Sequence, residues 1–217
     1  MDKRTHSGVV AGVLLGSVWA ASEVALGTLL RTVALPLRGS LLTGIGVGIL
    51  FAAFGYRHQL KSVAIALVIA VVAKVAFAPS FGFGITIINS SFAVLLEGAC
   101  VIALLALLRE PLRRHVWLRA GGALVAMLFA GTLFHAIGLH LAPCAYLKSL
   151  SAPMFFLRET VGWSLLSACT APLGYAAGVR WSARYSPDGT GVFSTFSYVG
   201  VIAVCWFCCG ITLWLQL

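Results

Sequence analysis

The stretch VVAGVLLGSVWAASEVALGTLL, residues Val9–Leu30, decides the fold of this chain. Glu23 is its single charged residue, and a helix needs about 20 mostly apolar residues to cross a bilayer. Transmembrane β-barrels use shorter, alternating segments, so such runs predict an all-α, polytopic membrane protein with about seven transmembrane helices. The other six apolar stretches are Ser40–Tyr56, Ser62–Ala78, Ile85–Leu108, Ala120–Ala142, Pro153–Val179 and Val192–Leu215.

The composition agrees with this interpretation. Of the 217 residues, 60% are hydrophobic and only 10% are charged, and the mean hydropathy is +1.01. An ordinary soluble domain has about 45–50% apolar and about 25% charged residues. The composition therefore excludes a water-soluble enzyme, a disordered chain and a disulfide-stapled secreted module.

Basic residues accumulate in every second connection between the apolar stretches. Three lie on one side, namely Arg31, Arg38 and Lys148, and ten lie on the other: Lys3, Arg4, Arg57, Lys61, Arg109, Arg113, Arg114, Arg119, Arg180 and Arg184. The positive-inside rule predicts a multi-pass protein of the cell (inner or cytoplasmic) membrane, with a cytoplasmic N-terminus and, after seven spans, an outside C-terminus. We assign the net charge of +9 to this topology and expect no nucleic-acid partner. The first apolar run continues beyond the small residues 20–22, so we expect an uncleaved first helix rather than a signal peptide.

Ionisable side chains within the spans all fall at the predicted midplane or in the outer half. They are Glu23, Lys74, Glu97, His135, His140, Arg158 and Glu159. Such residues are costly in lipid and usually face a cavity or a partner. One interpretation is an outward-open pocket in which the glutamates accept hydrogen bonds and the basic groups hold an anionic or carbonyl group. The other is a set of interhelical ion pairs, such as Lys74 with Glu97 or Glu23. Trp19 or Trp163 would stack on a ring of the ligand or pack in the core.

The outer connections form either lid loops over this pocket or ordinary turns. Their candidate lid residues are Arg31, Arg38, Phe81, Phe83 and Tyr146. Small residues recur every four positions at Gly8, Gly12, Gly16 and Ala20, and again at Ala21 and Ala25. Such faces let helices approach closely, here either within the bundle or against another subunit. For the pair Gly44 and Gly48, packing within the bundle is the favoured interpretation.

Metal binding and catalysis have little support in the sequence. Cys205, Cys208 and Cys209 lie in the last apolar stretch and are expected to pack as small hydrophobic residues. Cys144 and His140 are weak candidates for a transition-metal or corrinoid site, with a lone loop cysteine as the simpler interpretation. The chain has no phosphate loop, nucleophile elbow or His-Glu-x-x-His motif. We therefore expect neither an enzyme nor a resident cofactor.

Two segments resemble a known transporter family. The first runs from Trp19-Ala-Ala-Ser-Glu-Val-Ala-Leu-Gly27 to Leu35-Pro-Leu-Arg-Gly-Ser-Leu-Leu-Thr-Gly44, and the second joins Lys74-Val-Ala-Phe-Ala-Pro-Ser80 to Asn89 and Glu97-Gly98. Together they resemble the S components of energy-coupling factor (ECF) transporters. Those proteins typically have six spans, so residues 1–191 would form the S-component-like bundle and residues 192–217 an additional helix.

The resemblance implies a substrate-binding subunit that captures a vitamin-like micronutrient from outside. It implies a transmembrane coupling subunit and cytoplasmic ATPases as partners, with Ala21 and Ala25, or Gly12 and Gly16, as the docking surface. Asn89 joins the candidate substrate-binding residues. The alternative is a membrane anchor or assembly subunit of a larger, redox-active complex, which the additional helix and its cysteines would serve. A membrane enzyme that modifies a lipid or cofactor ranks last, because no motif favours it.

Overall fold

The computed structural model describes residues 3–33, 37–77, 84–141, 145–184 and 195–214, and these form helices without any strand. The first three long rods are α1 (Lys3–Ala21) continued by the π-helical turn η1 (Ser22–Leu26) and α2 (Gly27–Thr32), then α3 (Arg38–Arg57) and α4 (Leu60–Phe77). The remaining elements are α5 (Gly84–Leu107), α6 (Arg109–Arg114), α7 (Val116–Leu141), α8 (Ala145–Ser149), α9 (Ala152–Phe155), the π-helical turn η3 (Phe156–Thr160), α10 (Val161–Arg184) and α11 (Thr195–Trp214). The predicted all-α class is confirmed.

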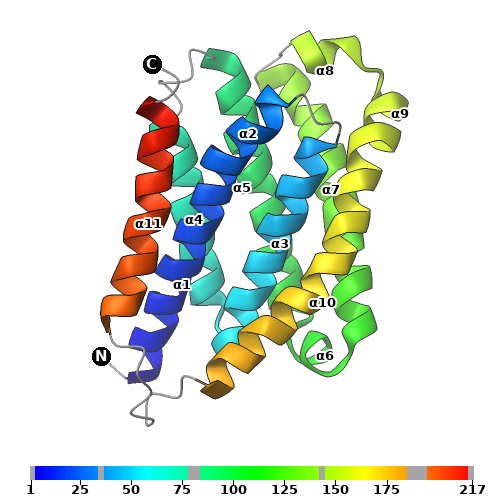
Figure 1. Ribbon diagram of the computed structural model, residues 1–217. Coiled ribbons are helices and arrows are strands. Elements are labelled where there is room, and N and C mark those ends of the chain that lie inside the picture. Colours follow the sequence, from blue (N-terminus) through cyan, green and yellow to red (C-terminus); the bar gives the residue numbers. More distant parts are fainter. Residues whose placement is uncertain (1–2, 34–36, 78–83, 142–144, 185–194, 215–217) are drawn as a thin grey trace.

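The long rods run alternately up and down in one bundle (Figure 1). Among the described residues, five helical segments are long and apolar enough to cross a membrane, namely Ser7–Thr32, Arg38–Arg57, Leu60–Phe77, Ile88–Leu107 and Val116–Leu141. The apolar part of α11, Tyr198–Thr212, is shorter than these. The α10 helix contains Pro172 and is less apolar on average. The multi-pass membrane fold is therefore supported, whereas the count of seven spans stays a prediction.

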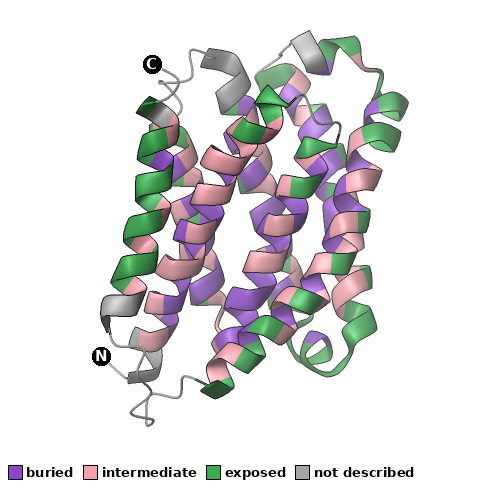
Figure 2. Ribbon diagram, in the orientation of Figure 1, coloured by how far each residue is buried: buried purple, intermediate pink, exposed green. Residues whose placement is uncertain are grey.

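The distribution of exposed residues suits a lipid environment. Buried residues lie toward the middle of the bundle and exposed ones on its periphery (Figure 2). Large hydrophobic side chains such as Val125 on α7, Phe129 on α7 and Leu173 on α10 are among the exposed ones. In water such apolar surface would favour association, whereas in a bilayer it meets acyl chains.

The two ends of the bundle differ in charge. The end that carries α6 also carries the last residue of α3, Arg57, and the last residue of α10, Arg184. At this end the Arg119 guanidinium donates to the carbonyl of Leu112 at 2.7 Å and lies 3.9 Å from the centre of the Tyr175 ring. The opposite end carries α2, α8 and α9 (Figure 1). The bundle thus has one strongly basic end.

The closest helix pair is α3 with α10. The Thr170 hydroxyl on α10 donates to the carbonyl of Gly44 at 2.7 Å. A Cβ atom at Gly174 would collide with the carbonyl oxygen of Gly48, and one at Gly178 would collide with the carbonyl of Ala52. Glycines at these positions let the two backbones touch. The internal packing expected for Gly44 and Gly48 is therefore confirmed.

The glycine face of α1 also packs inside the bundle. A Cβ atom at Gly12 would lie 2.8 Å from the carbonyl oxygen of Ser62, and one at Gly16 would lie 2.9 Å from Cα of Ala66, both on α4. The face of Gly12 and Gly16 therefore packs against α4 within the bundle, and a docking role for these residues stays a prediction. A single sequence does not distinguish the two uses, since any partner helix needs the same small residues.

The additional helix α11 packs mainly on α1 and η1 (Figure 1). Trp206 on α11 donates its indole N–H to Oγ of Ser17 at 3.2 Å and lies 6.0 Å from Phe77, ring centre to ring centre. Its Cys209 is buried, as expected for a packing residue, whereas Cys208 is exposed. The α11 helix is thus a peripheral element on the α1 side of the bundle.

Candidate functional site

The candidate site lies in the half of the bundle away from α6. Lys74 is within one turn of the end of α4, and His135 within two turns of the end of α7. Glu23 lies in η1, shortly before α2. The ends of α4 and α7 and the turn η1 all lie in the half of the bundle that carries α8 and α9 (Figure 1). The clustering of intramembrane polar residues in one half, expected from the sequence, is present in the fold.

The first group of polar side chains centres on Glu23. Its Oε2 lies 2.5 Å from Nζ of Lys74, and its Oε1 accepts a hydrogen bond of 3.3 Å from the indole N–H of Trp19. The indole reaches this place because Gly46 on α3 has no side chain; a Cβ atom there would lie 2.7 Å from the indole nitrogen. Both carboxylate oxygens of Glu23 are therefore occupied within the protein.

Glu97 occupies the middle of the bundle beside this pair. It is 5% exposed, and its Oε1 accepts a hydrogen bond of 3.0 Å from the Thr43 hydroxyl on α3. It is close enough to Glu23 and Lys74 to interact with both charges. We call these four residues, Glu23, Thr43, Lys74 and Glu97, the charged centre. Of the two ion pairs expected for Lys74, the structure forms the one with Glu23.

A second group consists of aromatic rings on α5, α7, α9 and α10. The ring of Phe134 lies 5.8 Å from Trp163, 6.0 Å from Phe155 and 6.2 Å from Phe92, centre to centre. The His135 imidazole stacks on Phe155 at 4.7 Å. We call these five residues the aromatic cluster. Offset and edge-to-face pairs at such distances attract each other, so the rings form a rigid wall.

Buried polar atoms border the aromatic cluster. Within the described part of the chain, Oγ of Ser40, Nδ1 of His135, Oγ1 of Thr160 and Nε1 of Trp163 have no hydrogen-bond partner. Their residues are at least nine-tenths buried. A buried polar group without a partner costs roughly 1–3 kcal/mol. Four such atoms around one cluster call for partners that the described part of the chain does not supply.

Two helices join the charged centre to the aromatic cluster. On α3, Ser40 precedes Thr43 by three residues, so both lie on one face about 4.5 Å apart along the axis. On α5, Leu96 packs against the aromatic rings next to Glu97. Asn89, also on α5, is buried, and its Oδ1 would lie 3.3 Å from a Cβ atom at Gly138 on α7. Helices α3 and α5 therefore each carry residues of the charged centre and residues next to the aromatic cluster.

The other predicted substrate-binding residues lie farther out. Glu159 is half-buried, and its Oε2 lies 3.5 Å from where a Cβ atom of Gly39 would be, close to the Trp163 indole. His140 and Arg158 are exposed, so the structure does not bring them into the site. Because successive side chains point in different directions around a helix, a predicted depth alone does not tell which side chains face inward.

The predicted lid and metal residues are only partly described. Arg31 and Arg38 are exposed and lie close enough for their charges to interact. Phe81, Phe83 and Cys144, together with the side chain of Tyr146, lie outside the described residues. Within the described ranges, no three His, Cys, Asp or Glu side chains come together as metal ligands. The predicted docking residues Ala21 and Ala25 are half-buried.

Sequence reasoning missed the hydroxyl groups of the site. Ser40, Thr43 and Thr160 are common residue types in membrane helices, and in most places they bond to their own helix. The Ser164 hydroxyl does so here, donating to the carbonyl of Thr160 at 2.7 Å. The one available signal was the position of Ser40 and Thr43 just after a predicted outer loop, in register with the polar residues of neighbouring spans.

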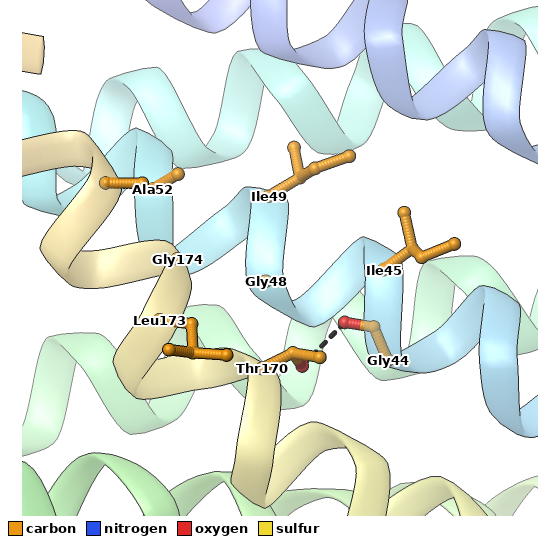
Figure 3. A pocket seen from close by; sticks show the side chains of 9 residues that line it. Gly44, Ile45, Gly48, Ile49, Ala52, Thr170, Leu173 and Gly174 are labelled. Carbon is orange, nitrogen blue, oxygen red and sulfur yellow. Dashed lines mark hydrogen bonds between the residues drawn. The ribbon is translucent and has the colours of Figure 1, made fainter.

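An apolar groove of about 360 Å³ lies elsewhere, along the seam between α3 and α10. Figure 3 shows the Thr170 hydrogen bond at its edge and the aliphatic side chains of Ile45, Ile49 and Leu173 around it. Leu173 is exposed on the periphery of the bundle. The groove carries no charged side chain among its lining residues, so it is separate from the polar site.

Comparison of the chain with models of protein families, with curated proteins and with solved structures finds no match.

Proposed function

We propose that this chain is a seven-span membrane protein that binds a small, vitamin-like micronutrient and serves as the substrate-binding subunit for its uptake. The observation that carries the proposal is the site formed by the charged centre and the aromatic cluster. It unites a buried carboxyl group, an ion pair, aromatic rings and four polar atoms that have no partner among the described residues, all inside an apolar bundle.

The energetics of the bilayer favour a ligand over a purely structural role. A buried ion pair is a weak stabiliser compared with apolar packing, and intramembrane polar groups are by default functional. The Lys74–Glu23 pair by itself fits a structural fastener. The unpartnered atoms of Ser40, Thr160 and Trp163 do not, because they add cost without adding contacts.

The charge distribution supports uptake from outside. The basic end of the bundle, with α6, is assigned to the cytoplasm by the positive-inside rule, which places the site in the outer half. The chain has no nucleotide-binding motif. We therefore assign the energy source to partner subunits, a transmembrane coupling protein and cytoplasmic ATPases. Since α4 packs against Gly12 and Gly16, Ala21 and Ala25 are the preferred docking residues.

Native mass spectrometry of the mildly purified protein tests the proposal. We expect a retained small molecule in the unmodified protein and its loss in the Glu97→Gln and Ser40→Ala variants. Thr132→Ala is the matched control, because Thr132 on α7 is exposed and its hydroxyl bonds only to its own helix, at the Leu128 carbonyl. Retention that is equal in all four proteins would contradict the site. Co-purifying enzyme subunits or a haem absorbance band would favour the membrane-anchor alternative.

A further inference from the structure

The charged centre contains two buried carboxyl groups and one cation. Among the described residues, the buried carboxyl groups are Glu23 and Glu97, and the cation between them is Lys74. Lys74 lies directly against Glu23, whose second oxygen is held by Trp19. Glu97 receives a neutral hydroxyl, that of Thr43. Among the described residues, Glu97 thus has no cation in direct contact. Burial disfavours the charged form of its carboxyl group, and a cation that enters the site would stabilise that form.

The aromatic cluster offers the complementary surface for a flat ring. Phe134, Phe155 and Trp163 stand at mutual ring-centre distances of 5.8–6.0 Å, with Trp163 edge-on to Phe155. Aromatic faces attract cations, most strongly when both are removed from water. The same faces stack on conjugated rings. Charge and shape therefore point to the same kind of ligand.

The unpartnered atoms add a requirement for hydrogen bonding. The indole N–H of Trp163 is a donor only, so its missing partner is an acceptor. The hydroxyls of Ser40 and Thr160 serve as donors or acceptors. A ligand that satisfies the indole must therefore carry an acceptor, such as a carboxamide oxygen, on its ring.

We infer that the ligand of this site is a flat, conjugated organic cation with a hydrogen-bond acceptor on its ring. Its positive charge is paired with Glu97, its ring lies against the aromatic cluster, and its acceptor receives the Trp163 indole N–H. This inference rests on the proposed function, because it names the substrate class of the same site. An anionic micronutrient would lack the pairing with Glu97, so we expect it to bind more weakly.

Binding of four small molecules to the purified full-length chain in lipid nanodiscs tests the charge, the ring and the acceptor of the ligand separately. The molecules are 1-methylnicotinamide, a ring cation with a carboxamide; nicotinamide, its neutral counterpart; nicotinate, the anionic one; and choline, a cation without a ring. Calorimetric titration should give the tightest binding for 1-methylnicotinamide, with nicotinamide and choline each about tenfold weaker and nicotinate weaker still. Equal or tighter binding of nicotinate or nicotinamide would overturn the inference.

Two variants with matched controls assign the features to residues. Glu97→Gln should remove the preference for the cation over nicotinamide, whereas Glu110→Gln should keep it, because Glu110 is exposed at the opposite end of the bundle. Trp163→Phe should weaken 1-methylnicotinamide about tenfold, with Trp117→Phe, an exposed tryptophan on α7, as control. If Glu97→Gln does not fold, the order of affinities of the four small molecules for the unmodified protein tests the inference.

Native mass spectrometry distinguishes failure of this inference from failure of the proposed function. A retained conjugated cation supports both. A retained molecule that is anionic or lacks a conjugated ring overturns the inference and leaves the substrate-binding function standing. The absence of any retained molecule, together with no binding of the four small molecules, contradicts the function itself.

Discussion

Nζ of Lys74 on α4 lies 2.5 Å from Oε2 of Glu23 in the π-helical turn η1. The two residues are 51 positions apart, and the pair ties the turn η1 to the last turn of α4. The side chain of Glu23 is 3% exposed and that of Lys74 is 15% exposed. Lys74 forms its ion pair with Glu23. The second buried glutamate, Glu97, therefore accepts a hydrogen bond from the Thr43 hydroxyl and is the residue that a ligand would contact.

Breaking this ion pair should destabilise the protein more than removing it altogether. In the Lys74→Met variant, Glu23 keeps its buried charge and loses its cation, which costs about 3–5 kcal/mol. In the double variant Glu23→Gln/Lys74→Met neither member of the pair carries a charge, and Trp19 still has an oxygen to which it donates. Thermal unfolding in detergent should therefore rank wild type and the double variant well above Lys74→Met. A double variant as unstable as the single one would show that the pair matters by contacts other than charge.

The α3–α10 seam should tolerate no added methyl group. A Cβ atom at Gly174 collides with the backbone carbonyl of Gly48, which belongs to a helix and has no flexible side chain that gives way. We expect Gly174→Ala to lower the free energy of unfolding by about 3 kcal/mol, at the upper end of typical overpacking costs. Gly121→Ala on α7 is the control, since a Cβ atom there meets nothing within 4 Å. Comparable melting temperatures for the two variants would contradict the close crossing.

His58 should make the stability of the basic end depend on pH. Burial lowers the pKa of its imidazole below the ordinary 6.5, and the neighbouring cations Arg113, Arg109 and Arg119 lower it further, against an opposing effect of Glu110. The folded state therefore binds the proton less tightly than the unfolded chain. The stabilisation by neutral His58 is fully present above about pH 6.5 and is lost as the pH falls below that value toward the lower folded pKa.

The His58→Asn variant tests this dependence. Asparagine tolerates the left-handed backbone of this residue, φ 55°, and keeps the carbonyl to which Arg109 donates at 2.5 Å. Melting temperatures between pH 7.5 and pH 5 should fall less in His58→Asn than in wild type. Parallel pH profiles of the two proteins would contradict the role of His58.

The seven-span topology predicts opposite locations for the two ends of the chain. A reporter that is active only outside the cytoplasm should be active when fused after Leu217 and when inserted after Lys148, and inactive after Arg184. The physical reason is the basic end of the bundle, which the positive-inside rule retains in the cytoplasm. An inactive reporter after Leu217, with the other two as expected, would reduce the count to six spans.

The peripheral helix α11 should be dispensable for folding of the remaining bundle. It packs mainly on α1 and η1, through contacts such as Trp206 to Ser17, and does not contribute to the charged centre or the aromatic cluster. A chain of residues 1–191 should therefore remain monodisperse in gel filtration and keep the retained ligand. Its melting temperature should fall by a few degrees, since a lost hydrogen bond and ring contact amount to about 1–2 kcal/mol. Aggregation of the shortened chain would show that α11 is part of the core.

The sequence predicted at what level of the bundle the polar residues lie, but not which of them face the interior. Glu23, Lys74, Glu97 and His135 stood out because ionisable residues are rare in long apolar runs. The structure buries Glu23, Glu97 and His135 and pairs Lys74 with Glu23. His140 and Arg158 stood out for the same reason but are exposed. The difference lies in helix rotation, which the packing of neighbouring helices sets and which hydropathy does not report.

The sequence by itself determined the class of the fold. In a bilayer the backbone polar groups must be satisfied within the protein, which leaves helices and closed β-barrels. Apolar runs as long as Val9–Leu30 are typical of helices, because barrel strands are shorter and alternate. Local composition is then enough to predict the helices and, through the basic residues between them, their orientation.

Only the tertiary structure decided which residues meet. The assignment of Lys74 to Glu23 rather than Glu97, the burial of the Gly12 and Gly16 face against α4, and the contact of Thr43 with Glu97 all join separate helices. Lipid surrounds every helix with the same apolar medium, so no local signal distinguishes an inward face from an outward one. Close packing between particular side chains makes that choice.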